Sequence, residues 1–201
     1  MPKHSHSLAL KGDGTVWAWG DNQFGQLGNN GWSDSRTPVQ VSSLSNVVNI
    51  AVGTYHSLAV KDDGTVWAWG YNYFGQLGDG TTTHWNMAVQ VIGLSNATAI
   101  AAGSYHSLAV NGNGSVWAWG YNSYGQLGDG TETNRLTPVQ VSGLDVVVSV
   151  IAGYRHSLAV KRDGTIWGWG YNSDGQLGDG KWNYLYNTPI QLWHIDIVDF
   201  R

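Results

Sequence analysis

Four histidines recur along this 201-residue chain at intervals of 50 residues, and a serine follows each of them: His6, His56, His106 and His156. Imidazole is a common metal ligand, so four such residues brought into a ring would form a metal site. The chain has no cysteine, and no glutamate completes a mixed ligand set at metal-site spacing. Because an identical residue in every repeat usually serves the repeat, we predict that each histidine is a structural hydrogen-bonding residue on an inner strand.

The adjacent histidine and serine also contain a base and a potential nucleophile, as in His56-Ser57. Neighbouring residues on a β-strand point to opposite faces of the sheet, whereas a nucleophile needs its base within hydrogen-bond distance. The sequence offers no other combination of nucleophile, base and oxyanion donors. We expect that the protein is not an enzyme and has no catalytic residues.

Charged residues in the glycine-rich loops suggest two further kinds of site. Asp79, Asp129 and Asp179 stand in Gly-Asp-Gly segments, but the calcium-loop pattern of alternating oxygen ligands and a closing glutamate is absent. Turn chemistry therefore explains these aspartates. Gly180-Lys181 lacks the hydroxyl residue and the upstream glycine spacing of a phosphate loop. We expect neither a metal nor a cofactor.

The elements that carry these residues are predicted to be strands. Residues 57–61 and 65–70 are strand-like runs separated by an Asp-Gly pair, and residues 88–91 and 97–101 form two more. Asp-Gly is a strong hairpin signal, because both central residues of a type I′ turn need a positive φ. Four short antiparallel strands in each repeat of about 50 residues make one propeller blade. We predict an all-β fold, a β-propeller of four-stranded antiparallel blades.

Two tryptophans stand at the same place in each repeat and predict how the blades pack. Trp67 and Trp69 share one face of their strand, whereas Val66 and Ala68 share the other. Both faces are apolar, as expected for a sheet between two neighbouring sheets, and a large face against a small one fills the wedge between blades. We assign this structural role to all the repeated tryptophans: Trp17, Trp19, Trp67, Trp69, Trp117, Trp119, Trp167 and Trp169.

The chain is predicted to be a single repeat domain, 1–201, with intact blades at about 38–70, 88–120 and 138–170. The C-terminal run 190–200 matches the first two strands of a repeat, and the N-terminal run 6–20 matches the last two. The two half blades are expected to form one composite blade, which removes exposed sheet edges. They meet within one chain, giving four blades, or between two chains, giving a closed eight-bladed homodimer.

The loops between Gly-Gln-Leu-Gly and the Pro-Val-Gln strand differ sharply between the copies and are the best candidates for binding. Equivalent loops emerge on the same side of a propeller, and tryptophan, tyrosine and arginine dominate interface energetics. Exposed aromatic clusters often mark binding surfaces. The alternative is that these side chains fold back onto their own blades. The predicted loop-face residues are Trp32, Arg36, Trp85, Arg135, Trp182, Tyr184 and Tyr186.

Composition limits the partners. The formal net charge is -4 with a pI near 5.9, which argues against a nucleic-acid surface rich in clustered lysine and arginine. No apolar run approaches the ~18 residues of a membrane helix, so no membrane is expected. The start Met1-Pro2-Lys3 leads into no hydrophobic signal region, so the chain as written is expected in the cytoplasm, or to be a piece of a larger secreted protein.

One family resemblance covers essentially the whole chain. The segments Ala-x-Gly-x-x-His-Ser-Leu-Ala-Val, Asp-Gly-Thr-Val-Trp-Ala-Trp-Gly, Asn-x-x-Gly-Gln-Leu-Gly-Asp-Gly and Thr-Pro-Val-Gln-Val resemble the repeat of the regulator of chromosome condensation family. The resemblance implies a propeller, usually of seven blades and closed by complementary termini, so four repeats depart from the family pattern. It also implies the family's activities: guanine-nucleotide exchange, chromatin binding, ultraviolet sensing and β-lactamase inhibition.

Two of these activities lack their motifs here. Exchange is associated with a wedge inserted in one blade, and the four copies carry no comparable insertion. Ultraviolet sensing is associated with Gly-Trp-Arg-His-Thr segments, and the nearest match, Gly153 to Ser157, has Tyr154 in place of tryptophan. We therefore predict a non-catalytic protein-binding scaffold that uses the variable loop face. The alternatives are a module that self-assembles into a ring, a carbohydrate-binding module and a nucleotide-exchange factor.

Overall fold

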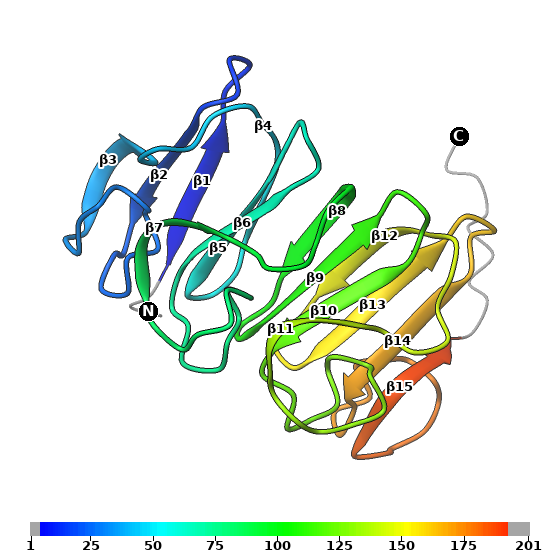
Figure 1. The fold of residues 1–201 in the computed structure, drawn as a ribbon. Helices are drawn as coiled ribbons and strands as arrows, with labels where there is room; N and C mark the ends of the chain where they lie inside the picture. The colour runs from blue at the N-terminus through cyan, green and yellow to red at the C-terminus, as the bar shows by residue number, and fades with distance from the viewer. Residues whose placement is uncertain (1–4, 193–201) are drawn as a thin grey trace, which may run out of the picture.

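The computed structural model describes residues 5–192, which form 15 strands in four antiparallel sheets (Figure 1). Each sheet contains consecutive strands of the chain, and the sheets follow one another in sequence order. The protein is therefore an all-β propeller-type structure, as the repeat pattern predicted. Within the described part of the chain, no helix is long and apolar enough to cross a membrane.

Three blades have four strands each, and the first has three within the described residues. The first blade contains β1 (His6–Leu10), β2 (Val16–Gly20) and β3 (Ser35–Gln40). The second contains β4 (Val47–Val52), β5 (His56–Lys61), β6 (Val66–Gly70) and β7 (Trp85–Gln90). The third contains β8 (Ala97–Ala102), β9 (His106–Asn111), β10 (Val116–Gly120) and β11 (Arg135–Gln140). The fourth contains β12 (Val147–Ala152), β13 (His156–Lys161), β14 (Ile166–Tyr171) and β15 (Leu185–Gln191).

The division into blades differs from the one expected from the sequence. Strand β7 pairs with β6, in the register Trp67↔Gln90 and Ala68↔Val89, and not with the strand that follows it. The long loop 71–84 folds back on itself and returns the chain to the edge of β6, whereas the shorter segment 91–96 crosses to the next blade. The intact blades therefore span 47–90, 97–140 and 147–191, in place of 38–70, 88–120 and 138–170.

The expected composite blade is affected by the same shift. Residues 190 and 191 lie in β15, which completes the fourth blade by pairing with β14, so they are not available to the first blade. The rest of the expected C-terminal half blade, 193–200, lies outside the described residues. Whether it joins the strands within 6–20 stays a prediction.

The hairpin between β5 and β6 forms as predicted, but with a different turn. Only Gly64 has a positive φ, of 76°, and its N–H donates to the Lys61 carbonyl at 2.9 Å. This is a turn followed by a left-handed glycine, not a type I′ turn with two positive φ angles. The Asp63 carboxylate accepts the Thr65 N–H at 2.9 Å and caps the turn.

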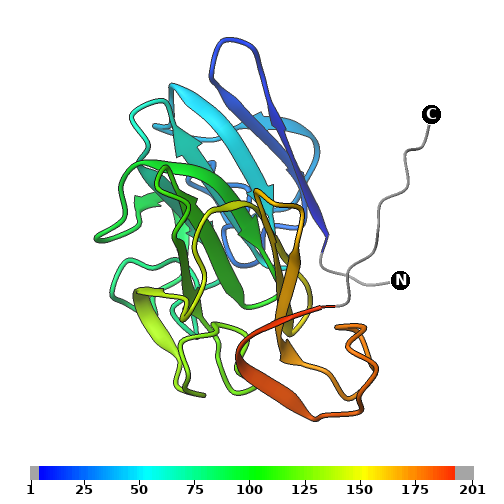
Figure 2. The ribbon, with the colours of Figure 1, turned by 90° about the vertical axis from the view of Figure 1, so that its right-hand side faces the viewer.

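The blades stack in one series. Strand β1 packs against β4, β5 against β8 and β9 against β12, while β4, β8 and β12 lie beside one another at the inner edge. The outer edges are β3, β7, β11 and β15. Figure 1 shows the first and fourth blades at opposite ends of this series, and Figure 2 shows the same arc turned by 90°.

A buried tryptophan joins each blade to the one before it. Trp69 of the second blade is fully buried against Val16, Ala18 and Leu27 of the first. Its indole N–H also donates to the Gln26 carbonyl at 2.9 Å, in the Gly-Gln-Leu-Gly loop of the first blade. Trp119 and Trp169 make the same bond to the Gln76 and Gln126 carbonyls, each at 2.8 Å. The large face of one blade therefore packs on the small face of the preceding blade, as the strand alternation predicted.

The loop that receives each indole requires glycine. Gly28 has a φ of 65°, and a Cβ at this position would stand 2.8 Å from the Trp69 Nε1 atom. Gly78 and Gly128 lie equally close to Trp119 and Trp169. A side chain at these positions would push the indole out of the interface. We call this arrangement of indole, loop carbonyl and loop glycine the tryptophan latch.

Replacement of the latch tryptophan should be costly. Trp119→Ala empties a fully buried site and leaves the Gln76 carbonyl without its indole donor, so we expect the free energy of unfolding to fall by about 3–5 kcal/mol. Trp117→Ala, on the same strand but half-buried at the edge of the interface, is the matched control and should cost clearly less. Urea denaturation measures both variants, and equal losses would contradict the latch.

Candidate functional site

The repeated histidines link neighbouring blades and do not meet in a ring. The Nε2 atom of His6 lies 2.8 Å from the Ser57 Oγ, and that of His56 lies 2.9 Å from the Ser107 Oγ. His106 reaches Ser157 in the same way, at 3.0 Å. Each of these three histidines thus bonds the serine of the following blade. In residues 5–192, no group of three or more His, Asp or Glu side chains is arranged to hold a metal ion.

The serine in each pair determines the histidine tautomer. Ser57 Oγ donates its one proton to the Gln26 carbonyl at 3.0 Å, so it must accept a proton from Nε2 of His6. The Nδ1 atoms of His6, His56 and His106 are buried without a hydrogen-bond partner. A proton added there would carry a buried, unpaired charge. Burial therefore lowers the pKa of His56 and of His106 to about 3, and that of His6 to about 4.

The aspartates of the Gly-Asp-Gly segments organise their own loops. In the second blade, Asp79 Oδ1 accepts hydrogen bonds from the Asn72 side chain at 3.0 Å and from the Thr81 N–H at 3.1 Å. Asn72 is fully buried, and its Oδ1 accepts the Leu77 N–H at 2.9 Å. The same buried asparagine recurs as Asn22, Asn122 and Asn172. The loops are therefore rigid, and their protruding side chains are held in place.

Three predicted loop-face residues fold back onto these aspartates. The Trp85 indole donates to Asp79 Oδ2 at 2.8 Å, and Arg135 forms an ion pair with Asp129 at 2.7 Å. The Tyr186 hydroxyl donates to Asp179. All three are half-buried at the start of an outer strand. Each of these side chains bonds the aspartate of its own loop. Its polar group is therefore less available to bind a ligand.

The other four predicted residues face solvent. Trp32, Trp182 and Tyr184 are 52%, 81% and 60% exposed, and Arg36 is exposed on β3. Tyr184 contacts Tyr124 and Tyr171, with ring centroids 6.1 and 5.8 Å apart. Their part in binding stays a prediction.

A larger aromatic surface lies beside Tyr184. Its rings come from two kinds of segment: the turns before β5 and β9, and the loops that follow β2, β6, β10 and β14. The rings contact one another within blades and across all three blade boundaries, where the centroids lie 4.6 to 6.1 Å apart. We call this surface the aromatic strip; its members are Phe24, Tyr55, Tyr71, Phe74, Tyr105, Tyr121, Tyr124, Tyr171 and Tyr184.

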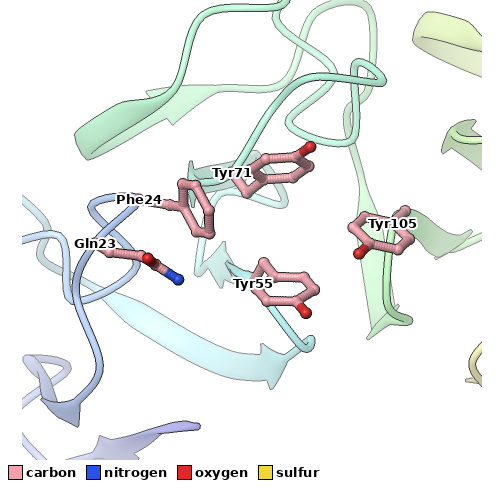
Figure 3. Close-up of a pocket in the computed structure, with 5 residues that line it drawn as sticks. All are labelled: Gln23, Phe24, Tyr55, Tyr71 and Tyr105. Atoms are coloured by element: carbon pink, nitrogen blue, oxygen red, sulfur yellow. The ribbon is translucent and has the colours of Figure 1, made fainter. Parts of the chain in front are cut away.

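The strip is hollowed towards its Phe24 end. Tyr55 and Tyr105, from neighbouring blades, stack with centroids 5.4 Å apart and an angle of 21°. They line a hollow of about 150 Å³ together with Gln23, Phe24 and Tyr71 (Figure 3). A shallower depression of about 460 Å³ adjoins the same turns and is lined by 52–54, 102–104 and 152–154. Partial burial raises the pKa values of Tyr71 and Tyr105, so both hydroxyls are neutral donors and acceptors.

The strip carries one cation and changes character at its ends. The Arg155 guanidinium lies over the rings of Tyr124 and Tyr154, at 4.5 and 4.9 Å from their centroids. Where the middle repeats have Tyr71 and Phe74, the first repeat has Asp21 and the fourth has Asp174 at one equivalent position each. The aromatic surface is therefore concentrated over the central blades and bordered by charge.

The sequence interpretation missed most of this strip. The recurrence of Tyr71, Tyr121 and Tyr171 directly after three of the four Trp-Gly pairs, and of Tyr55 and Tyr105 directly before histidine, was the available signal. A recurring residue indicates a structural role, so the sequence favours the variable loops as the binding surface. Contact between rings 50 residues apart in sequence appears only once the blades stack.

A family model described as RCC1-like domain matches residues 3–199, nearly the whole chain. Among solved structures, yeast RCC1 (Prp20) bound to Kap60 is 26% identical, with a TM-score of 0.84, and the match covers 94% of this chain and 47% of that one. Human WBSCR16 is also 26% identical, with a TM-score of 0.84, over 94% of this chain and 51% of that one. The chain thus spans about half the length of these structures.

A curated relative matches a shorter stretch. The human E3 ubiquitin-protein ligase HERC2 is 36% identical over 52 residues, which is 25% of this chain and 1% of that protein. The mouse protein of the same name matches equally. A stretch of this length corresponds to about one repeat.

The buried histidines predict that acid destabilises the protein before its carboxylates titrate. An unfolded histidine has a pKa near 6.5, whereas folded His56 and His106 stay neutral down to about pH 3. Between these values the unfolded chain binds more protons, so the free energy of unfolding decreases as the pH falls below about 6.5. Each of the two histidines contributes a slope of about 1.4 kcal/mol per pH unit there. Urea denaturation at about pH 7, 6, 5 and 4.5 measures this dependence of the free energy of unfolding on pH.

His106→Gln identifies the source of this slope. Glutamine keeps a side-chain N–H donor for Ser157 but does not titrate, so the variant should lose the contribution of about one proton. His84→Gln, in the partly exposed loop 71–84, is the matched control and should change the slope much less. An unchanged slope in His106→Gln would show that the buried histidine is not responsible.

Proposed function

Because the chain belongs to the family of RCC1-like domains, we propose that it is a non-catalytic scaffold that binds another protein through the aromatic strip. The observation that carries the proposal is the continuous run of partly exposed rings from Phe24 to Tyr184 across the loop face. Tyrosine and tryptophan provide large contact areas at a low cost in conformational entropy, and they dominate binding energies at protein interfaces.

The rigidity of the loops supports this role. The Asn72 side chain holds its loop from within, and the tryptophan latch holds the same loop against the next blade. A surface that is ordered before binding loses little entropy when a ligand arrives. The exposed Tyr184 carries the strip onto the fourth blade.

The chemistry of the strip favours an extended peptide segment of the partner. Aromatic grooves with hydroxyl groups bind proline and aliphatic side chains by ring contact and the peptide backbone by hydrogen bonds. The stacked Tyr55 and Tyr105 form such a groove beside Gln23. Arg155, held over Tyr124, provides a cation for an acidic residue of the peptide.

The structural relatives are consistent with a protein partner. Yeast RCC1 (Prp20) is seen bound to Kap60, and a second Prp20 structure, 26% identical with a TM-score of 0.80, is described with its binding to Gsp1p and histones. All of these ligands are proteins. Because this chain covers only 47% and 49% of the two Prp20 chains, we carry over the kind of ligand and none of the named partners.

Peptide selection tests the proposal. A random peptide library displayed on phage, panned against the 201-residue protein, should enrich sequences with proline or aliphatic residues and one acidic residue. Tyr105→Ala removes one wall of the hollow and should weaken the best peptide at least ~30-fold in fluorescence polarisation. Thermal denaturation checks that the variant is folded.

Ile92→Ala is the control for this experiment. Ile92 is 53% exposed in the segment 91–96, at the opposite end of the strands from the strip, and its loss should leave peptide affinity unchanged. A peptide that binds Tyr105→Ala as well as the parent protein would overturn the assignment of the site. Enrichment of no peptide, together with binding on a glycan array, would replace protein binding by carbohydrate binding.

A further inference from the structure

The first blade has one half of a tryptophan latch. Its Trp19 corresponds to Trp69 and Trp119, which are fully buried, but Trp19 is only half-buried. Among the described residues its indole N–H has no acceptor. Ser7 is also half-buried and has no loop carbonyl to bond within residues 5–192, whereas the equivalent Ser57 bonds Gln26. The exposed face of the first blade therefore lacks the loop that every later blade receives.

The fourth blade has the other half. Its loop contains Gly178, with a φ of 67° and no heavy atom within 4 Å of the position of a Cβ, although Gly78 and Gly128 touch an indole there. The Gln176 carbonyl has no donor among the described residues, and the His156 ring has no serine. Leu158 and Ile166 are half-buried, whereas the equivalent Leu58 and Val66 are fully buried.

We propose that a second copy of this chain docks head to tail, so that the fourth blade of one copy receives Trp19 of the other. The contact repeats the three interfaces seen within the chain. The Trp19 indole donates to the Gln176 carbonyl of the second copy, as Trp169 donates to Gln126 at 2.8 Å. His156 donates to Ser7, as His106 does to Ser157 at 3.0 Å.

The occupant is inferred from the match between the two faces. The three interfaces within the chain show that a blade carrying this motif binds the small face of another. Among the described residues, the fourth blade differs at four positions of that face: Ile166, Ile190 and Leu192 replace valines, and Gly168 replaces alanine. The added methylene groups are partly balanced by the missing Cβ of Gly168, around which the side chains of Leu158, Leu177 and Leu192 close. The face keeps its apolar character and its approximate volume.

A contact between two different faces has a recognisable consequence. Head-to-tail association leaves one free head and one free tail after the first contact, and it ends only when these meet in a ring. Two copies that make both contacts form a closed ring of eight blades, and no sheet face remains uncovered. We therefore expect a dimer of twice 21.8 kDa in light scattering coupled to size exclusion.

We call the face of the first blade that carries Trp19 the head, and the face of the fourth blade that receives it the tail. Gly178→Asn tests the tail. Asparagine tolerates a positive φ better than other side chains, and no heavy atom of residues 5–192 lies near this position, so the fold should persist. In the dimer, the new side chain would collide with the incoming Trp19 indole and raise the dissociation constant at least ~30-fold. Gly143→Asn is the matched control, because Gly143 has the same φ of 67° and equally open surroundings, in the segment between β11 and β12.

A mixing experiment separates head-to-tail contact from any symmetric one. Trp19→Ala lacks a functional head and Gly178→Asn lacks a functional tail, so each variant alone should be a monomer. An equimolar mixture contains one intact head and one intact tail, and it should form a dimer with one of each, detectable by native mass spectrometry. The proposal is overturned if the parent protein is still a monomer at a concentration about 100-fold above that of the light-scattering experiment, which is the range that a weak interface requires. It is also overturned if mixing the two variants restores no dimer. Because the peptide assay uses Tyr105 and this one uses Trp19 and Gly178, either proposal can fail alone.

Discussion

Each blade is held to the preceding one by an indole N–H that donates to a loop carbonyl, and most other features of the structure depend on this bond. Trp69 reaches Gln26 across the interface, while the carbonyl of the same glutamine also accepts the Ser57 hydroxyl. That hydroxyl then accepts from His6. One loop carbonyl thus orders a tryptophan, a serine and a histidine tautomer. Because these groups are buried, water cannot replace a missing partner at low cost.

The latch couples packing to the display of the loop face. The loop that receives the indole is the one whose buried asparagine, Asn22 or Asn72, shapes the segment that follows. In the two central blades, the turn before the repeated histidine carries a ring of the aromatic strip, Tyr55 or Tyr105. Stacking the blades therefore brings those rings together. The aromatic strip thus arises from the same contacts that stabilise the fold.

Coupling only between neighbours also explains why the two ends differ from the middle. In a repeat array, stability comes from each repeat and from its interface with the next. The terminal blades of a soluble array are expected to have a polar outer face, yet Trp19 and Ile166 remain apolar and half-buried. The aromatic strip, by contrast, does become polar towards its ends, at Asp21 and Asp174. The aromatic strip therefore ends in charged residues, whereas the outer faces of the two terminal blades stay apolar.

The amino-acid sequence alone determined the fold class, because its signals are local: a period of 50 residues, Asp-Gly turns and strands that alternate tryptophan with small residues. It also identified the apolar blade faces, since alternation along a strand needs no tertiary information. Only the tertiary structure decided which blade the strand 85–90 completes, because it has a potential partner on either side and the folded loop 71–84 selects one. It also turned Trp85, Arg135 and Tyr186 towards aspartates and brought Tyr55 against Tyr105. Those contacts join residues that come within reach only after a loop has closed or two blades have stacked.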